Sequence, residues 1–87
     1  MQTNEEWLDH MQVQLSAVCK AQNWDVKQTS ALAVGTRSFV VKYGSKSVTV
    51  LISSLICTRI HADVILEHDN IEYDDEQIRT LLARKLQ

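Results

Sequence analysis

The feature that most constrains the fold is a long block of strand-forming sequence, residues 37–67, which one short turn interrupts. Large apolar side chains alternate with smaller or charged ones from Phe39 to Tyr43, and alternation resumes after the Gly-Ser-Lys turn at residues 44–46. Alternation with a period of two is typical of strands with one buried face, and a short glycine-containing turn between two such runs predicts a β-hairpin. The block therefore predicts an antiparallel sheet.

Three further strand predictions complete the sheet. The returning strand, residues 48–52, is expected in its interior, because Leu51 is apolar on the face opposite its apolar neighbours. The serine pair at 53–54 predicts a bulge or break, and alternation then predicts a last strand over residues 60–66. A weaker pattern over residues 24–34 predicts an edge strand.

Two helices are expected to flank these strands. Thr3 and Glu6 form a capping-box pattern at the start of the first helix, and apolar side chains then recur at steps of three and four residues. Asp74 and Gln77 form the same pattern at the start of the second helix. The chain therefore predicts one α+β domain, residues 1–87: a helix, an antiparallel β-meander of three to four strands and a helix, with both helices packed on one face of the sheet.

This order of elements resembles double-stranded-RNA-binding domains, which run helix, three strands, helix at a similar length. In that family a lysine-rich cluster opens the final helix and contacts phosphates. The matching positions here are Asp74, Asp75 and Glu76, whose charge repels phosphate. The resemblance therefore covers topology alone, and we assign neither a family nor a site from it.

Composition narrows the classes of function. A chain of 87 residues has room for one domain and no deep enclosed active site. A net charge of −2 gives no overall attraction to nucleic acid or anionic lipid. Acidic residues near the N-terminus, the absence of a long apolar run and two widely spaced cysteines predict a cytoplasmic protein with reduced thiols and no membrane contact.

Candidate catalytic and metal-binding residues are few. His61 and Asp63 are expected on one strand face near Cys57, but nucleophilic catalysis also needs an oriented base and an oxyanion donor. Cys57, His61 and His68 lack the paired spacing that makes zinc motifs specific. We therefore expect a protein that is not an enzyme, without catalytic residues, cofactor or metal.

A concentrated run of acids is the first candidate binding surface. Its six members are Glu67, Asp69, Glu72, Asp74, Asp75 and Glu76. Together with a sheet edge, this run predicts a protein-binding module, a small regulator, inhibitor or immunity-type protein of bacterial or phage character, whose partner has a basic surface. Helix capping and solvation are the alternative explanation of the same charges.

The predicted hairpin is the second candidate surface. Its residues are Arg37, Lys42, Tyr43 and Lys46. Bases beside an aromatic ring on a β-ribbon predict nucleic-acid binding, whereas lysines on exposed strands also serve only to block edge pairing. An open sheet edge further predicts a possible homodimer.

Overall fold

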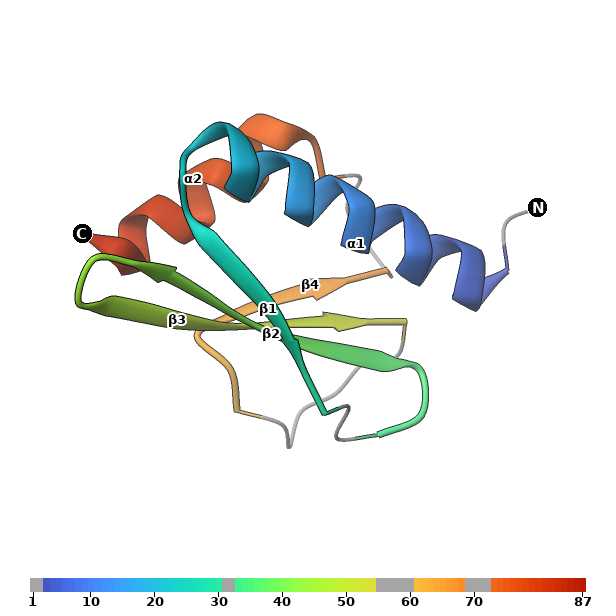
Figure 1. Ribbon diagram of the computed structural model, residues 1–87. Helices are drawn as coiled ribbons and strands as arrows, with labels where there is room; N and C mark the ends of the chain where they lie inside the picture. Colours follow the sequence, from blue (N-terminus) through green and yellow to red (C-terminus); the bar gives the residue numbers. More distant parts are fainter. Residues whose placement is uncertain (1–2, 31–32, 55–60, 69–72) are drawn as a thin grey trace.

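A four-stranded sheet and two helices make up the computed structural model, which describes residues 3–30, 33–54, 61–68 and 73–87 (Figure 1). In chain order the elements are α1 (Asn4–Ala21), β1 (Asp25–Thr29), β2 (Thr36–Tyr43), β3 (Lys46–Ser53), β4 (Val64–Glu67) and α2 (Asp75–Leu86). The α+β class predicted from the sequence is confirmed. The predicted strands over residues 24–34 and 60–66 are shorter than expected, and residues 31–32 and 60 of those ranges lie outside the described residues.

The sheet is mixed, which corrects the predicted antiparallel meander. Its strand order is β1-β2-β3-β4, so β3 is interior as predicted. The β1–β2 and β2–β3 pairs are antiparallel, but β4 runs parallel to β3, with Val64 beside Val50 and Glu67 beside Ser53. Period-two alternation marks a strand without stating its direction. The fourth, parallel strand also departs from the three-strand order of the family that the sequence resembles.

The β2–β3 hairpin closes through a two-residue loop. Tyr43 pairs with Lys46, which leaves Gly44 and Ser45 as the loop. Gly44 has φ +62°, a left-handed conformation that glycine adopts at no steric cost, and glycine is the residue required first in a type II′ turn. Local chemistry thus fixes this hairpin, as predicted.

Hydrogen bonds at the ends of the helices explain where the helices begin and stop. The Thr3 hydroxyl accepts from the Glu6 amide at 3.1 Å, which starts α1. Of the predicted capping box, α1 therefore forms this one bond, and the described residues show no return bond from the Thr3 amide to the Glu6 side chain. At its end, Asn23 has φ 60° and the Trp24 amide donates to the Cys19 carbonyl at 2.9 Å, the pattern of a Schellman cap.

α2 begins with the predicted capping box. The Asp74 carboxylate accepts from the Gln77 amide at 2.8 Å, and the Gln77 side chain accepts from the Asp74 amide at 2.9 Å. Both bonds satisfy amides that the first turn of a helix leaves without a partner.

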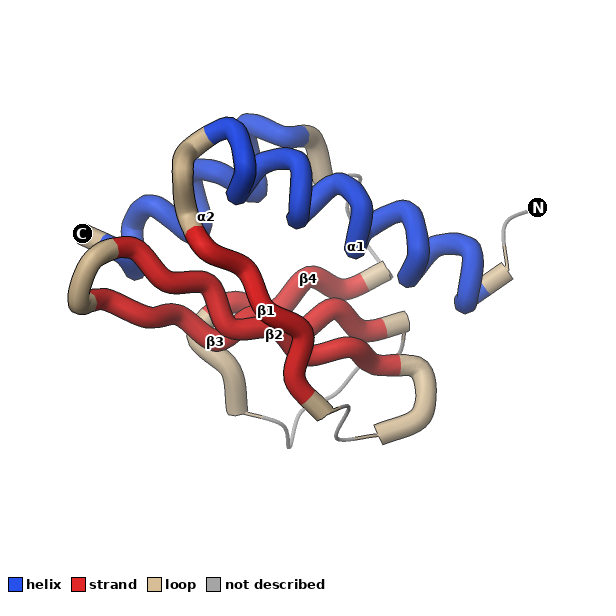
Figure 2. The backbone as a smooth tube through the Cα atoms, viewed as in Figure 1, coloured by secondary structure: helices blue, strands red, loops and turns tan. Residues whose placement is uncertain are grey.

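One apolar core joins both helices to the strands. Figures 1 and 2 show α1 and α2 on the same side of the sheet. The core contains Trp7, Leu8, Met11, Leu15, Val18 and Cys19 of α1, Ile78, Leu82 and Leu86 of α2, and Phe39, Val41, Val48, Val50, Ile52, Val64 and Leu66 of the strands. Leu51, of opposite parity in β3, is also buried, with 1% of its surface exposed. None of the described helices is long and apolar enough to cross a membrane.

Candidate functional site

The acidic run is divided between β4 and α2. Glu67 ends β4, whereas Asp74, Asp75 and Glu76 form the N-cap and first turn of α2. Three of these acids already have partners: Asp74 caps the helix, Asp75 accepts from the Gln14 side chain at 3.1 Å, and Glu76 lies 3.7 Å from Arg79. Asp69 and Glu72 lie outside the described residues.

Tyr73 holds the end of β4 against the start of α2. Its hydroxyl accepts a hydrogen bond from the backbone amide of Glu67 at 3.3 Å. Its backbone carbonyl accepts from the Gln14 side chain of α1 at 2.8 Å. The described acids therefore come from two elements that this one tyrosine brings together.

The outer edge of β4 is open for part of its length. β4 is the last strand of the sheet, and the backbone amide of His68 points inward, to the Ser53 carbonyl at 3.1 Å. Successive amides of a strand point to opposite sides. The Glu67 amide therefore points outward, where Tyr73 accepts it, and Ile65 presents its N–H and C=O on that same outer side.

A groove runs along this edge. One hollow of about 400 Å³ follows the outer side of α2 from Tyr73 to Arg84. An adjoining hollow of about 430 Å³ shares Leu81 and Arg84 with it and extends to β4. The second hollow is lined by Asp63, Val64, Ile65, Leu81, Arg84 and Lys85. We call the two hollows together the β4–α2 groove.

Charge is unequal at the two ends of the groove. Arg84 and Lys85 lie beside the start of β4, and among the described residues neither forms a salt bridge. Asp63 lies close to them, but its carboxylate turns toward β3, where it accepts from the Thr49 amide at 2.9 Å and the Thr49 hydroxyl at 3.1 Å. These two bonds, with a smaller contribution from the charge of Lys85, hold the pKa of Asp63 below its usual range. The opposite end of the groove carries Glu76.

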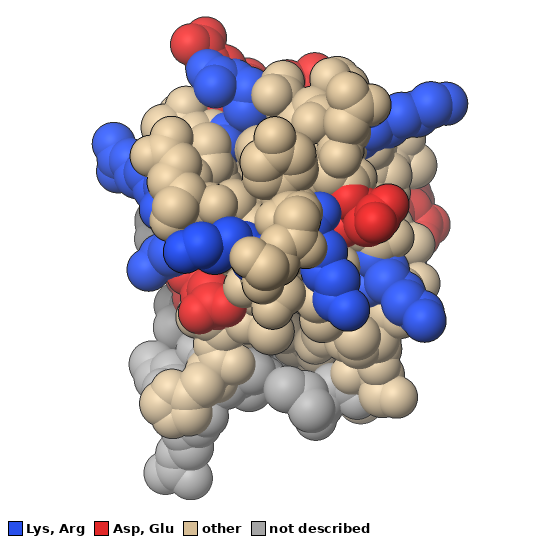
Figure 3. Space-filling model, turned by 60° about the vertical axis from the view of Figure 1, so that its left-hand side comes forward, with Lys and Arg blue, Asp and Glu red and all other residues tan. Residues whose placement is uncertain are grey.

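The hairpin end of the molecule is rich in bases. Lys42, Tyr43 and Lys46 are all exposed, and 56% of the Tyr43 surface is accessible. Figure 3 shows Lys and Arg side chains spread over the face at this end, with fewer Asp and Glu among them. Figure 1 shows the C-terminal end of α2 at the same end of the molecule as the hairpin turn, and Arg84 and Lys85 lie in the last turn of that helix.

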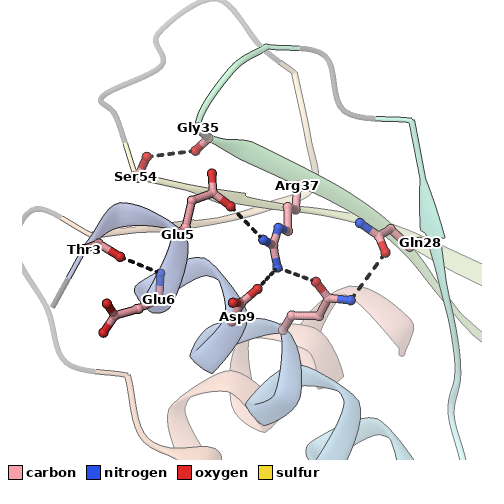
Figure 4. Close-up of polar contacts among 9 residues, drawn as sticks. Thr3, Glu5, Glu6, Asp9, Gln28, Gly35, Arg37 and Ser54 are labelled. Atoms are coloured by element: carbon pink, nitrogen blue, oxygen red, sulfur yellow. Dashed lines mark hydrogen bonds and ion pairs between the residues drawn. The ribbon is translucent and has the colours of Figure 1, made fainter.

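Arg37 stands apart from the other three residues predicted at the hairpin surface. Its guanidinium donates to Asp9 at 2.7 Å, to Gln12 at 2.7 Å and to Glu5 at 3.1 Å (Figure 4). The hydrogen bond to Asp9 is the main cause of its raised pKa. Arg37 lies five positions before Lys42 in β2, roughly 17 Å along an extended strand. The structure therefore does not bring Arg37 into the hairpin group.

The cysteine and histidine candidates fall in different places. Cys57 lies outside the described residues, His61 is exposed, and the ring of His68 packs edge-on against Trp7 with centroids 4.7 Å apart. Within the described ranges, no three His, Cys, Asp or Glu side chains come together in a way that could hold a metal ion. Cys19 is fully buried, and burial raises the pKa of its thiol to about 11.

Sequence reasoning missed the groove. In the sequence, Arg84 and Lys85 are explained fully as bases at the end of a helix, where they complement its dipole, and nothing marks Ile65 or Leu81 as their neighbours. One signal in the sequence is the number of residues between the last two strands. The segment from Ser54 to Asp63 is longer than a usual hairpin loop. A connection of this length is long enough to return the chain to the other end of the sheet, so that β4 can run parallel to β3.

No protein-family model, curated protein or solved structure matches this chain.

Proposed function

We propose that this chain is a small non-enzymatic module that binds another protein through the open edge of β4 and the acidic run that follows it. The acidic run begins at Glu67, the last residue of β4, and returns to Asp74 at the cap of α2. The proposal takes both helices to cover one face of the sheet, which leaves the outer side of β4 accessible. Such a module would act in the cytoplasm as a regulator, inhibitor or immunity-type protein.

The observation that carries the proposal is the arrangement of hydrogen bonds at the edge. Tyr73 satisfies the outward amide at Glu67, whereas the outward groups of Ile65 stand beside a groove lined by Leu81, Arg84 and Lys85. An exposed strand edge binds a partner strand through main-chain hydrogen bonds, and the adjacent pockets supply selectivity for side chains. The acids then add attraction for a basic partner, which acts mostly on the association rate.

Affinity capture with matched variants tests this function. Glu76→Lys reverses an exposed charge of the acidic run at the groove, and Glu6→Lys makes the same change on α1, outside the groove. We expect wild type and Glu6→Lys to capture the same protein from a nuclease-treated native lysate, and Glu76→Lys to capture markedly less. Equal capture by all three forms would remove the acidic run from the proposal.

Ile65→Pro tests the edge separately. Proline has no backbone N–H, so the variant cannot donate a hydrogen bond from position 65 to a carbonyl of the partner strand. Thermal unfolding of the same variant shows whether it remains folded. A folded Ile65→Pro variant that captures the partner as well as wild type would contradict strand addition at β4.

Nucleic-acid binding at the hairpin is the second candidate function. The observation that favours it is the exposure of Lys42, Tyr43 and Lys46, with no salt bridge to either lysine among the described residues. Lysines contact phosphates, and an exposed aromatic ring stacks on unpaired bases.

A salt series on a generic duplex and a generic single strand tests this second function. Each phosphate contact contributes to the slope of log affinity against log salt, so Lys42→Ala and Lys46→Ala should weaken binding and each reduce the slope by about 0.7 to 0.9. Absence of binding by wild type at low salt would exclude it.

A further inference from the structure

We infer that the β4–α2 groove binds an extended peptide that places a carboxylate against Arg84 and Lys85 and a basic group toward Glu76. This inference rests on the proposed function, since it names the chemistry of the partner for that edge. It requires three properties of the groove: a main-chain pairing position, an apolar wall and unequal charge at its two ends.

The pairing position is Ile65. Its N–H and C=O lie on the outer side of β4, whereas the next outward amide, that of Glu67, already donates to Tyr73. A peptide strand can therefore pair beside the first part of β4, and pairing stops where Tyr73 covers the edge. The pairing therefore centres on Ile65 and is shorter than the four residues of β4.

The apolar wall is formed mainly by Leu81, which is partly exposed and lines the hollow of about 430 Å³ between β4 and α2 together with Val64. The Ile65 side chain points to the other face of the sheet, beside Leu51, so Ile65 contributes its backbone to the groove. A peptide side chain that enters this hollow removes apolar surface from water, which favours binding. Bases at the end of a helix complement its dipole whether or not a hollow lies beside them. The dipole therefore explains the presence of Arg84 and Lys85 but not the hollow next to them.

Charge fixes the orientation of the peptide. Arg84 and Lys85 have no salt-bridge partner in the described part of the chain, and the neighbouring Asp63 carboxylate is held by Thr49. A carboxylate from outside would therefore form charge-assisted hydrogen bonds there, and arginine can hold it with two.

The two ends of the groove set the direction of the chain. Arg84 and Lys85 lie at the start of β4, and Glu76 lies toward its end. A peptide whose C-terminal carboxylate meets the bases runs antiparallel to β4, the slightly more stable of the two pairings. Its amino-terminal part then lies near Glu76, which favours a lysine or arginine there.

An array of immobilised hexapeptides tests the inference. One array carries free C-terminal carboxylates, a second ends in carboxamides, and a third ends in carboxamides after a C-terminal glutamate. The labelled proteins are wild type, Arg84→Glu/Lys85→Glu and the matched control Lys20→Glu/Lys27→Glu, which changes the same number of exposed charges on α1 and β1, outside the groove.

We expect wild type to bind the free-carboxylate array best and to prefer a base near the amino end of the peptide. Loss of a charge-assisted contact predicts about tenfold weaker binding to the carboxamide array and by the Arg84→Glu/Lys85→Glu variant. The Lys20→Glu/Lys27→Glu variant should bind within about twofold of wild type, because neither lysine lines the groove. Recovery on the third array would assign the carboxylate to a side chain instead of the terminus.

Two results would overturn the inference. One is the absence of any peptide bound by wild type, and the other is binding that the Arg84→Glu/Lys85→Glu variant retains in full. If either occurs while lysate capture still depends on Ile65 and Glu76, the proposed function stands without this partner chemistry. If capture also loses that dependence, the proposed function fails as well.

Discussion

Arg37 joins β2 to α1, and its charge serves that contact. Its side chain is 19% exposed, whereas its partners Glu5 and Asp9 are 73% and 67% exposed. Pairs with exposed acids contribute little individually, but the packed arginine stem and the further bond to Gln12 add to the total.

We expect Arg37→Ala to lower the free energy of unfolding by about 1 to 2 kcal/mol, from two weak ion pairs and lost packing. Urea unfolding measures the change, and part of it should disappear in high salt because the pairs are exposed. Lys42→Ala, on the same strand without a salt bridge among the described residues, should cost less than about 0.5 kcal/mol. Equal costs would show that the Arg37 cluster contributes nothing to stability.

Cys19 makes stability depend on alkaline pH. The folded thiol has its pKa raised from 9.0 to about 11 by burial, so it stays protonated while the unfolded thiol ionises. The contribution of the protonated thiol to the free energy of unfolding is therefore fully present below pH 9. As pH rises toward 11, the free energy of unfolding falls by about 2 to 3 kcal/mol. Comparison of urea unfolding for wild type and Cys19→Ala between pH 8 and pH 11 isolates this dependence, and parallel curves would contradict it.

At the scale of elements, structure set by neighbouring residues was predictable and the direction of β4 was not. Both helix starts and the Gly44 turn follow from contacts within a few residues, so their patterns are complete in the sequence. The edge strand over residues 24–34 ends early, at Thr29, where the polar run from Lys27 to Ser30 offers little apolar surface to bury. The β4–α2 groove depends on where β4 returns to the sheet, which is a contact between distant segments.

Asp63 anchors the start of β4 to β3. Its hydrogen bonds with Thr49 lower its pKa in the folded protein. These bonds therefore stabilise the fold at pH values above the usual pKa of an aspartate, and the stabilisation is lost as pH falls through the lowered pKa of the folded state. We expect Asp63→Asn to unfold with a flatter acid profile than wild type below about pH 4. Circular dichroism across an acid titration measures both profiles, and identical profiles would show that this carboxylate does not stabilise β4.

At the scale of the whole molecule, the charges are distributed unevenly along an elongated body of 36 × 24 × 19 Å. α1 and α2 both begin with acids and end with bases, namely Glu5 and Glu6 before Lys20, and Asp75 and Glu76 before Arg84 and Lys85. The net charge of −2 therefore does not reveal that acids and bases lie at opposite ends of each helix. Net charge alone could not tell whether the charged residues are clustered or spread evenly over the surface.

Self-association is a separate prediction at this scale. β1 and β4 are the two outer strands of the sheet, and either can pair with its counterpart in a second copy. Sedimentation at micromolar concentration should then give the mass of a dimer. A single monomer mass would exclude the dimer without affecting recognition of a different protein at β4.

Backbone amide hydrogen exchange along β4, measured by NMR on the protein alone, tests the central claim most directly. The account predicts rapid exchange at Ile65, slow exchange at Leu66 and His68, whose amides point toward β3, and intermediate protection at Glu67 from the Tyr73 hydroxyl. Exchange at Ile65 as slow as at Leu66 would show that this edge is already covered, and the proposed binding surface would not exist.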